Sequence, residues 1–235
     1  MRATDWEFKN RAMVFGLVFG LGFAMYALDH QTSTAVLGNW LAARFAIEEA
    51  FVDHLLFAFA TLLLAVAALL RTWASSYLQA DVVYAGHVKT ASLVADGPYR
   101  RVRNPLYFAN VLMAAGMGAM MSRAGFVVVI AAMLGFCFRL ILREEFELRG
   151  SQGESYQRYR EAVPRLWPSF SPRVASAGRP AKWADGFKAE SWCWGFAAAV
   201  LAFAITLNNA AFFGILGASI ALLWLLSALS EKRAA

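Results

Sequence analysis

Residues 106–142 read LYFANVLMAAGMGAMMSRAGFVVVIAAMLGFCFRLIL, two long apolar runs with a short polar break between them. The break is Ser122-Arg123-Ala124, which is too short to separate two domains. Two apolar helices joined by so few residues are typical of a tight helical hairpin. Long runs that are almost free of charge are what a bilayer requires, because about 20 apolar residues span its hydrocarbon core. We therefore predict that this hairpin lies in a membrane.

Four further apolar runs flank the hairpin. Of the 235 residues, 60% are hydrophobic and 16% are charged, and the mean hydropathy is +0.49. Soluble domains are about 45–50% apolar and about 25% charged. Several runs are shorter than about 20 residues, so flanking residues must complete them or the bilayer must thin locally. The predicted fold class is all-α, a polytopic membrane bundle of about six transmembrane helices. The six runs cover residues 12–28, 55–70, 106–121, 125–142, 192–207 and 210–229.

The first run could instead be a secretory signal peptide. Arg2, Lys9 and Arg11 precede it, as basic residues precede the apolar part of such peptides. Its far end, residues 26–30, lacks a small-x-small cleavage site. This favours a membrane helix that is kept in the protein.

The charges of the loops predict the orientation in the membrane. Residues 29–53 carry four acidic residues and one arginine, whereas the stretches 71–103 and 143–190 are rich in Lys and Arg. With six spans, every basic stretch and both termini fall on one side, which the positive-inside rule makes the cytoplasm. Arg123, at the hairpin tip, is an exception.

The remaining composition excludes other classes. Membrane orientation explains the net charge of +6, and we find no nucleic-acid-binding motif. Cys137 and Cys193 both lie in apolar runs, where we expect small buried hydrophobic residues and no disulfide framework. No pattern specifies an oligomeric state.

Residues 93–107 combine a turn, arginines and a helix start. Residues 96–98 (Asp-Gly-Pro) have turn chemistry. Pro105 suits the first turn of a helix, and Asn104 is then a candidate N-cap. Helix N-termini attract anions, and Arg103 would stand beside this one. Two interpretations stay open here: a basic flank of a membrane helix, or a site for an anionic ligand.

Charged residues also mark the end of the fourth run. Arg139 lies within the run, where a charge must reach the interface or find a partner in a polar pocket. Glu144 and Glu145 point about 100° apart on a helix, so one can face a site while the other meets Arg103 or Arg139. The same stretch offers two i,i+4 ion pairs of a solvated helix, Arg143 with Glu147 and Glu145 with Arg149.

Residues 153–168 form a short amphipathic element. Tyr156, Tyr159 and Val163 share a helical face, and the proline after Val163 ends the helix. The element could close a pocket or lie on the membrane surface. Residues 168–180 are rich in Ser, Pro, Gly and Ala and are predicted to be a linker.

In this order, these features resemble the integral-membrane methyltransferases, which include isoprenylcysteine carboxyl methyltransferases and phospholipid N-methyltransferases. The resemblance covers residues 87–168 of the chain. Each motif is weak alone, but the ordered set around a two-helix hairpin is fairly specific. The matching residues are Gly97, Pro98, Tyr99, Arg103, Asn104, Pro105, Leu106, Tyr107, Arg139, Glu144, Glu145, Gly153, Tyr156, Tyr159 and Pro164.

The resemblance implies methyl transfer from S-adenosylmethionine, with a small cofactor-binding part on the cytoplasmic side. It implies catalytic roles for Arg103, Asn104, Arg139 and Glu145, and no metal. The cofactor-binding residues that it implies are His87, Leu93, Val94, Tyr99, Arg103, Asn104, Pro105, Tyr107, Glu144 and Glu145.

On this interpretation the chain has four parts. The first two membrane helices occupy residues 1–80, and the methyltransferase-like core occupies residues 81–168. A linker follows over residues 169–190, and residues 191–235 form the last two membrane helices, which do not match the common core of the family.

Asn104 is a second departure, because it replaces the family's histidine. Asparagine can cap a helix and bind a ligand, but it does not ionise near neutral pH. The change is tolerable if the histidine only binds the cofactor. If the histidine moves a proton, this protein has altered chemistry or none.

The methyl donor is an activated sulfonium, so the protein must mainly align the reactants. Glu144 or Glu145 suits its ammonium group or its ribose hydroxyls, and Arg103 with the helix-start N–H groups suits its carboxylate. Tyr99 or Tyr107 could lie near the sulfonium.

The methyl acceptor is expected to be lipophilic or small, and to enter from the membrane lipids. A prenylcysteine carboxylate, a phospholipid amine and a thiol all stay open. Arg139 would hold the acceptor's carboxylate or phosphate, or more simply pair with Glu144 or Glu145.

Three other interpretations compete. One is a membrane NAD(P)H-dependent reductase of the sterol-reductase type, although no basic cluster is devoted to a 2′-phosphate. Another is a non-catalytic membrane protein, which Asn104 favours. The third is a metal site at Glu49, Asp53 and His54, whose ligand set is incomplete.

Overall fold

The computed structural model describes residues 1–78 and 95–234, and for residues 226–234 it describes the backbone alone. Within these residues the protein is built from helices, and its only strand-like feature is an isolated bridge between Thr32 and Ser122. The all-α class is therefore confirmed.

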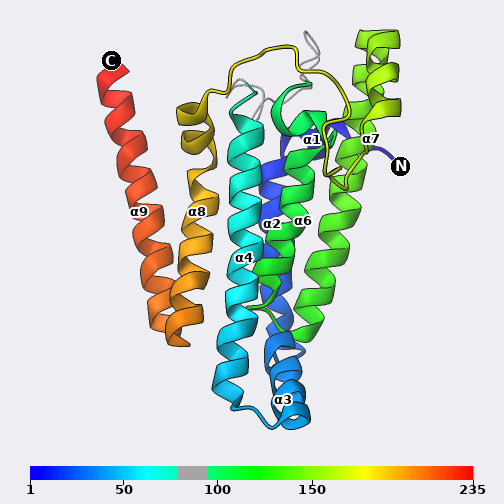
Figure 1. Ribbon diagram of the computed structural model, residues 1–235. Coiled ribbons are helices and arrows are strands. Elements are labelled where there is room, and N and C mark those ends of the chain that lie inside the picture. Colours follow the sequence, from blue (N-terminus) through cyan, green and yellow to red (C-terminus); the bar gives the residue numbers. More distant parts are fainter. Residues whose placement is uncertain (79–94, 235) are drawn as a thin grey trace.

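The helices form an elongated bundle with α4 at its centre (Figure 1). Helix α4 packs against α6 and α8, α7 packs against α6 and α2, and α9 packs against α8. Helix α9 ends at the same end of the bundle at which the chain begins (Figure 1). The elements are α1 (Asp5–Lys9), α2 (Arg11–Ala24), η1 (Met25–Ala27), α3 (Ser33–Phe45), α4 (Glu49–Ser75), η2 (Gly97–Arg100), α6 (Pro105–Gly118), α7 (Arg123–Ala162), α8 (Trp183–Thr206) and α9 (Asn209–Ala234).

Helices α6 and α7 form the predicted hairpin. Ser122 caps α7, since its hydroxyl accepts a hydrogen bond from the N–H of Gly125 at 3.1 Å. Helix α7 has 40 residues and is kinked at Gly153, where the backbone is not helical. Its part before the kink, residues 123–152, is about 45 Å long and therefore longer than the hydrocarbon core is thick. Its apolar part ends at residue 142, so the following turns, which carry Glu144 and Glu145, project beyond the membrane.

Three helices among the described residues are long and apolar enough to cross a bilayer, namely α4, α7 and α8. This agrees with an integral membrane protein. Two other apolar helices, Arg11–Ala27 and Asn209–Leu225, are shorter. Helix α6 has 14 residues and is about 21 Å long, less than the hydrocarbon thickness. All six apolar runs lie in helices, but a bundle with six spans stays a prediction.

The end of the bundle opposite the chain start contains α3, for which the sequence predicts no helix. Thr32 caps it, accepting a hydrogen bond from the N–H of Ala35 at 2.9 Å. Arg123, the basic exception at the hairpin tip, forms an ion pair with Asp29 here at 3.0 Å. Hydrogen bonds from the Arg123 guanidinium, helped by backbone N–H groups, hold the pKa of Asp29 at about 2. The charge at the hairpin tip is thus compensated by a local acid.

Helix α8 approaches α4 closely at Gly186. A Cβ atom at this position would collide with the backbone oxygen of Thr72 and crowd Ser76. Small residues permit such close contacts between membrane helices. Glycine here brings the first turns of α8 against the last turns of α4.

Residues 163–182, which we call the return segment, run back across the end of the bundle. The segment includes most of the predicted linker, and it is held by backbone hydrogen bonds of 2.7–2.9 Å to η2, the start of α6 and the end of α4. The N–H of Arg103 donates to Pro164, and the N–H of Ser169 donates to Arg101. The N–H of Arg173 donates to Arg100, and the N–H of Lys182 donates to Ser76.

Asp96 fixes the second half of the return segment. Its carboxylate accepts hydrogen bonds from the hydroxyl of Ser176 at 2.5 Å and from the N–H groups of Ala177 and Arg179 at 2.9 and 3.2 Å. Burial raises the pKa of Asp96, but these hydrogen bonds outweigh burial and hold the pKa below its ordinary value. Gly97 follows with φ +57°, a conformation that favours glycine.

We expect Asp96→Ala to lower the free energy of unfolding by about 1.5–3 kcal/mol, because three donors lose a charged acceptor. The pKa of Asp96 is lower in the folded protein than its unfolded value of about 3.9. The contribution of Asp96 to stability is therefore fully present above its unfolded-state pKa, and it is lost as the pH falls through its folded-state pKa. Denaturation of the detergent-solubilised protein between pH 7 and pH 3 measures both effects.

Asp185→Ala is the matched control for Asp96→Ala, since Asp185 is exposed in the first turn of α8. An equal loss of stability in both variants would contradict the role of Asp96.

Candidate functional site

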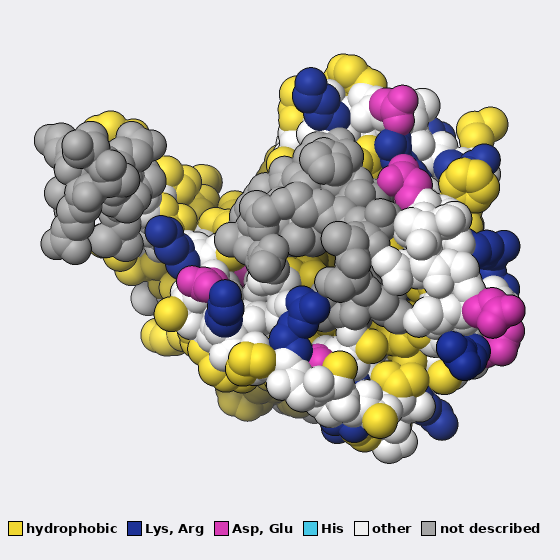
Figure 2. All heavy atoms as spheres, turned by 90° about the horizontal axis from the view of Figure 1, so that it is seen from above, with side chains coloured by type: hydrophobic (Ala, Val, Ile, Leu, Met, Phe, Trp, Pro, Cys, Tyr) yellow, Lys and Arg dark blue, Asp and Glu magenta, His cyan; other side chains and the backbone are white. Residues whose placement is uncertain are grey.

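Three segments meet where α6 begins: the η2 turn, the part of α7 beyond residue 142, and the start of the return segment. This place lies toward the end of the bundle at which the chain begins. Figure 2 looks onto this end and shows Lys and Arg side chains around its rim, with Asp and Glu side chains among them. Arg103, Glu144 and Glu145, which the sequence motifs name, lie here.

Glu145 stands between two arginines. Its Oε1 lies 2.7 Å from Nη1 of Arg103, and the Arg165 guanidinium donates to both carboxylate oxygens at 3.1 and 2.9 Å. The side chains of Arg103 and Glu145 are 9% and 6% exposed, so this pair is largely removed from water. The carboxylate therefore joins α7 to both the start of α6 and the return segment.

Glu144 points to a different partner. Its Oε1 accepts a hydrogen bond from the hydroxyl of Tyr107 in α6 at 2.6 Å. The two adjacent glutamates thus have separate environments, as expected from their angular offset on a helix. Glu145 is the one that meets Arg103, and Glu144 is left with a neutral hydroxyl as its hydrogen-bond partner.

Asn104 occupies the N-cap position of α6, with Pro105 in the first turn. Its side chain makes no capping hydrogen bond, so this part of the prediction is wrong. Instead Nδ2 donates to the backbone oxygen of Arg165 at 3.0 Å. The buried amide therefore holds the return segment against α6.

Tyr99 lies under the last turns of α7. Its backbone oxygen accepts a hydrogen bond from the hydroxyl of Tyr159 at 2.8 Å, and burial raises the pKa of the Tyr99 hydroxyl well above its ordinary value. Tyr156, Tyr159 and Val163 form a buried cluster with Ala95 and other residues. Of the two interpretations of the amphipathic element, the structure thus supports packing over the site.

Arg139 does not pair with Glu144 or Glu145, which corrects the simpler expectation for it. Its Nη2 lies 2.7 Å from Oε2 of Glu7 in α1. A partner near the N-terminus could not be predicted from local spacing. Nothing in this geometry places Arg139 beside the other predicted site residues.

Arg103 has side-chain donor atoms that form no hydrogen bond of good geometry among the described residues. Among the described residues, its buried Nε and Nη1 atoms have no hydrogen-bond acceptor in suitable geometry, although Nη1 is close to Glu145. Buried polar groups are normally hydrogen-bonded, so the unused donors suit an anionic group of a ligand. His87, Leu93 and Val94, the other predicted cofactor-binding residues, lie outside the described residues.

A second buried polar network lies between α4, α6 and α8, and motif analysis missed it. Arg71 donates to Glu190 at 2.6 Å and to Asn110 at 2.5 Å, and Ser75 donates to Glu190 at 2.6 Å. Glu190 is fully buried, and Arg71 is 7% exposed. A charge at such depth is costly in a membrane bundle unless it is paired.

Sequence signals for this network existed but were weak. Arg71 and Ser75 are four residues apart at the end of an apolar run, and Asn110 is a polar residue within another. Asn110 also lies three residues after Tyr107, so both are on one face of α6. The network is therefore a neighbour of the Tyr107–Glu144 pair.

The metal interpretation finds no support near His54. Its Nδ1 lies 2.6 Å from the backbone oxygen of Ala204, so the ring joins α4 to α8. Among residues 1–78 and 95–225, whose side chains are described, no three His, Cys, Asp or Glu side chains are grouped as metal ligands. Cys137 and Cys193 are both buried, as expected for small hydrophobic residues.

Residues 55–151 match the family model of phospholipid methyltransferases. The match confirms the resemblance to the integral-membrane methyltransferases. It covers most of α4, η2, α6 and α7 as far as residue 151, and so includes Arg103, Glu144 and Glu145. Helix α8 and Glu190 lie outside it.

Two curated relatives are metal-resistance proteins. The cobalt-zinc-cadmium resistance protein CzcN of Cupriavidus metallidurans is 27% identical over 138 residues, which are 59% of this chain and 61% of the relative. The nickel-cobalt-cadmium resistance protein NccN of Alcaligenes xylosoxydans xylosoxydans is 26% identical over 101 residues, 43% of this chain and 44% of the relative. The chain thus matches less than two thirds of either relative. No solved structure matches it at a significant level.

We expect Glu190→Gln to lower the free energy of unfolding by about 3–5 kcal/mol, because it removes the buried carboxylate that pairs with Arg71 at 2.6 Å. Replacing both residues by methionine removes both charges and should restore most of the stability. Denaturation of the detergent-solubilised protein measures these effects. Glu161→Gln, at an exposed end of α7, is the control. A Glu190→Gln variant as stable as the control would show that the ion pair contributes little.

Proposed function

We propose that this protein is an integral membrane methyltransferase that moves a methyl group from S-adenosylmethionine to a lipophilic or small acceptor. One observation carries the proposal. Arg103 and the adjacent Glu144 and Glu145 converge across the folded-back hairpin, within the stretch that matches the phospholipid methyltransferases.

The side chains present fit the charged groups of the cofactor. The unused buried Nε of Arg103 suits the carboxylate of S-adenosylmethionine, because hydrogen bonds between a guanidinium and a carboxylate are charge-assisted and strong. Glu144 suits the ammonium group or the ribose hydroxyls. Its carboxylate accepts a hydrogen bond from the neutral Tyr107 hydroxyl, and burial raises the pKa of Glu144 to about 7. A cationic group of a ligand beside it would therefore stabilise the ionised carboxylate.

Bound S-adenosylmethionine supplies a methyl group that its sulfonium already activates. The protein therefore contributes alignment more than acid or base chemistry. Tyr107 holds the Glu144 carboxylate, and Glu145 holds the Arg103 guanidinium. The ring of Tyr107 or Tyr99 would favour the nearby positive charge by about 0.5–2 kcal/mol.

The acceptor enters from the lipid in this proposal, because the site lies where the apolar part of α7 ends. A prenylcysteine carboxylate, a phospholipid amine and a thiol are the candidate acceptor groups. Arg139 is no longer the best candidate to hold an acceptor anion, because Glu7 already pairs with it.

A radiolabelled methyl-transfer assay tests the activity. The full-length protein is incubated with methyl-labelled S-adenosylmethionine, total membrane lipids and a panel of small thiols. We expect the label in a lipid or thiol product that depends on the protein. An absence of label from every product would contradict the proposed function.

We expect Glu144→Gln to weaken S-adenosylmethionine binding by about 1.5–3 kcal/mol, the range for a charged hydrogen bond. Calorimetry on the detergent-solubilised protein measures this. Glu147→Gln is the matched control, because Glu147 is on the same helix and, among the described residues, forms its ion pair with Arg143 at 2.8 Å. Equal affinity in the variant and the wild type would refute the placement of the cofactor.

We expect Asn104→His to raise turnover with little change in cofactor affinity, since an imidazole titrates near neutral pH and can still donate to the backbone of Arg165. The methyl-transfer assay over pH 6–9, with calorimetry alongside, separates the two effects. Unchanged turnover would leave position 104 with the structural role that the Arg165 contact gives it.

A further inference from the structure

The N-terminal segment is docked along α7. The N–H of Ala3 donates to the backbone oxygen of Arg139 at 3.1 Å. Two ion pairs of 2.7 Å, Glu7 with Arg139 and Asp5 with Arg143, hold α1 against the same helix. These contacts place Arg2 beside the part of α7 that leaves the membrane.

Arg2 and α7 border a small open pocket. Its lining residues are Arg2, Leu142, Glu145, Phe146, Arg149 and Arg165. The guanidinium carbon of Arg2 lies 3.7 Å from the ring centroid of Phe146, so a cation–π contact orients this arginine. The pocket thus gathers three arginines beside one carboxylate.

The charges of this pocket are not balanced. Glu145 already binds Arg103 and Arg165. The predicted i,i+4 pair of Glu145 with Arg149 does not form, and neither Arg149 nor Arg2 has an ion-pair partner among the described residues. Two guanidinium groups therefore remain available to an anion with several oxygen atoms.

The position of the pocket indicates the kind of anion. It begins at Leu142, where the apolar part of α7 ends, so it lies at the membrane–water interface. Phe146 is 59% exposed at the pocket and Phe138 is 49% exposed two turns earlier, on the membrane side. An anion bound here would sit at the level of lipid phosphates, with an apolar surface below it for acyl chains.

We propose that Arg2, Arg149 and Arg165 form a binding site for the phosphate of an anionic membrane lipid. A free phosphate ion would use the arginines but not the exposed aromatic rings below them. The site lies on the flank of Glu145 and is independent of methyl transfer. Its ligand needs neither an amine nor a thiol.

Competition between two lipids tests the site. The detergent-solubilised full-length protein is mixed with equal amounts of phosphatidylglycerol and phosphatidylcholine, and native mass spectrometry measures the bound ratio. We expect a preference for phosphatidylglycerol of about fivefold for each available arginine. Arg2→Gln with Arg149→Gln should bring the ratio close to one.

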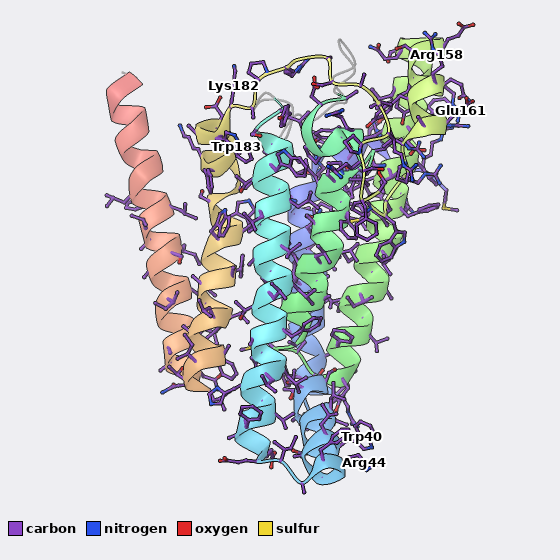
Figure 3. All side chains as sticks on the ribbon, viewed as in Figure 1. Trp40, Arg44, Arg158, Glu161, Lys182 and Trp183 are labelled. Carbon is purple, nitrogen blue, oxygen red and sulfur yellow. The ribbon has the colours of Figure 1, made fainter. Side chains whose placement is uncertain are left out.

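Arg158→Gln with Lys182→Gln is the matched control. Both residues are exposed near the same end of the bundle and are not among the lining residues, and Figure 3 shows Arg158 on the last turns of α7 and Lys182 before α8. The control removes the same charge and should keep the wild-type ratio. An equal loss in the control, or no preference in the wild type, would overturn the site.

A third measurement, of thermal stability, distinguishes binding of the lipid from binding of free phosphate. Phosphatidylglycerol should raise the thermal stability of the wild type and the control, but not that of the Arg2/Arg149 variant. Inorganic phosphate at the same concentration should have no such effect. If inorganic phosphate displaces the lipid or stabilises the protein equally, the ligand is an ion and the lipid assignment is wrong.

Discussion

The ion pair between Arg103 and Glu145 holds together the part of the protein that carries the motifs. Arg103 precedes α6, and Glu145 lies in α7 on the other side of the hairpin. Both side chains are nearly excluded from water. In such surroundings an unpaired charge is costly, and a paired charge restricts the position of its partner. Because Arg165 binds the same carboxylate, the return segment is fixed by it too. The neighbouring Glu144 points away from this pair and accepts a hydrogen bond from Tyr107.

A second ion pair supports α6 one turn beyond Tyr107. Glu190 of α8 holds Arg71 of α4, and Arg71 donates to Asn110 of α6. Since Asn110 is three residues from Tyr107, the two polar networks contact neighbouring positions on one face of α6. Arg71 of α4 and Glu144 of α7 thereby both hold this short apolar helix.

The sequence was sufficient to predict the features that depend on residues close together in the chain. Apolar runs predicted where the helices lie, and the short break at residues 122–124 predicted the hairpin. The angular offset of adjacent glutamates predicted that they would have different partners. Long-range pairing was not predictable: Glu7 with Arg139 and Arg71 with Glu190 join residues more than one hundred positions apart. Asn104 was expected to cap its helix, but a tertiary contact competes for its side chain.

Helix α8 lies outside the stretch that matches the methyltransferase family, yet it supplies the buried carboxylate opposite Arg71. A chain shortened after residue 168 would keep every motif residue and lose this counter-ion. The motif-bearing part is therefore not an interchangeable module. Loss of the last two helices would take the Glu190 carboxylate away from Arg71, so these helices and the residue at position 71 are expected to change together in evolution.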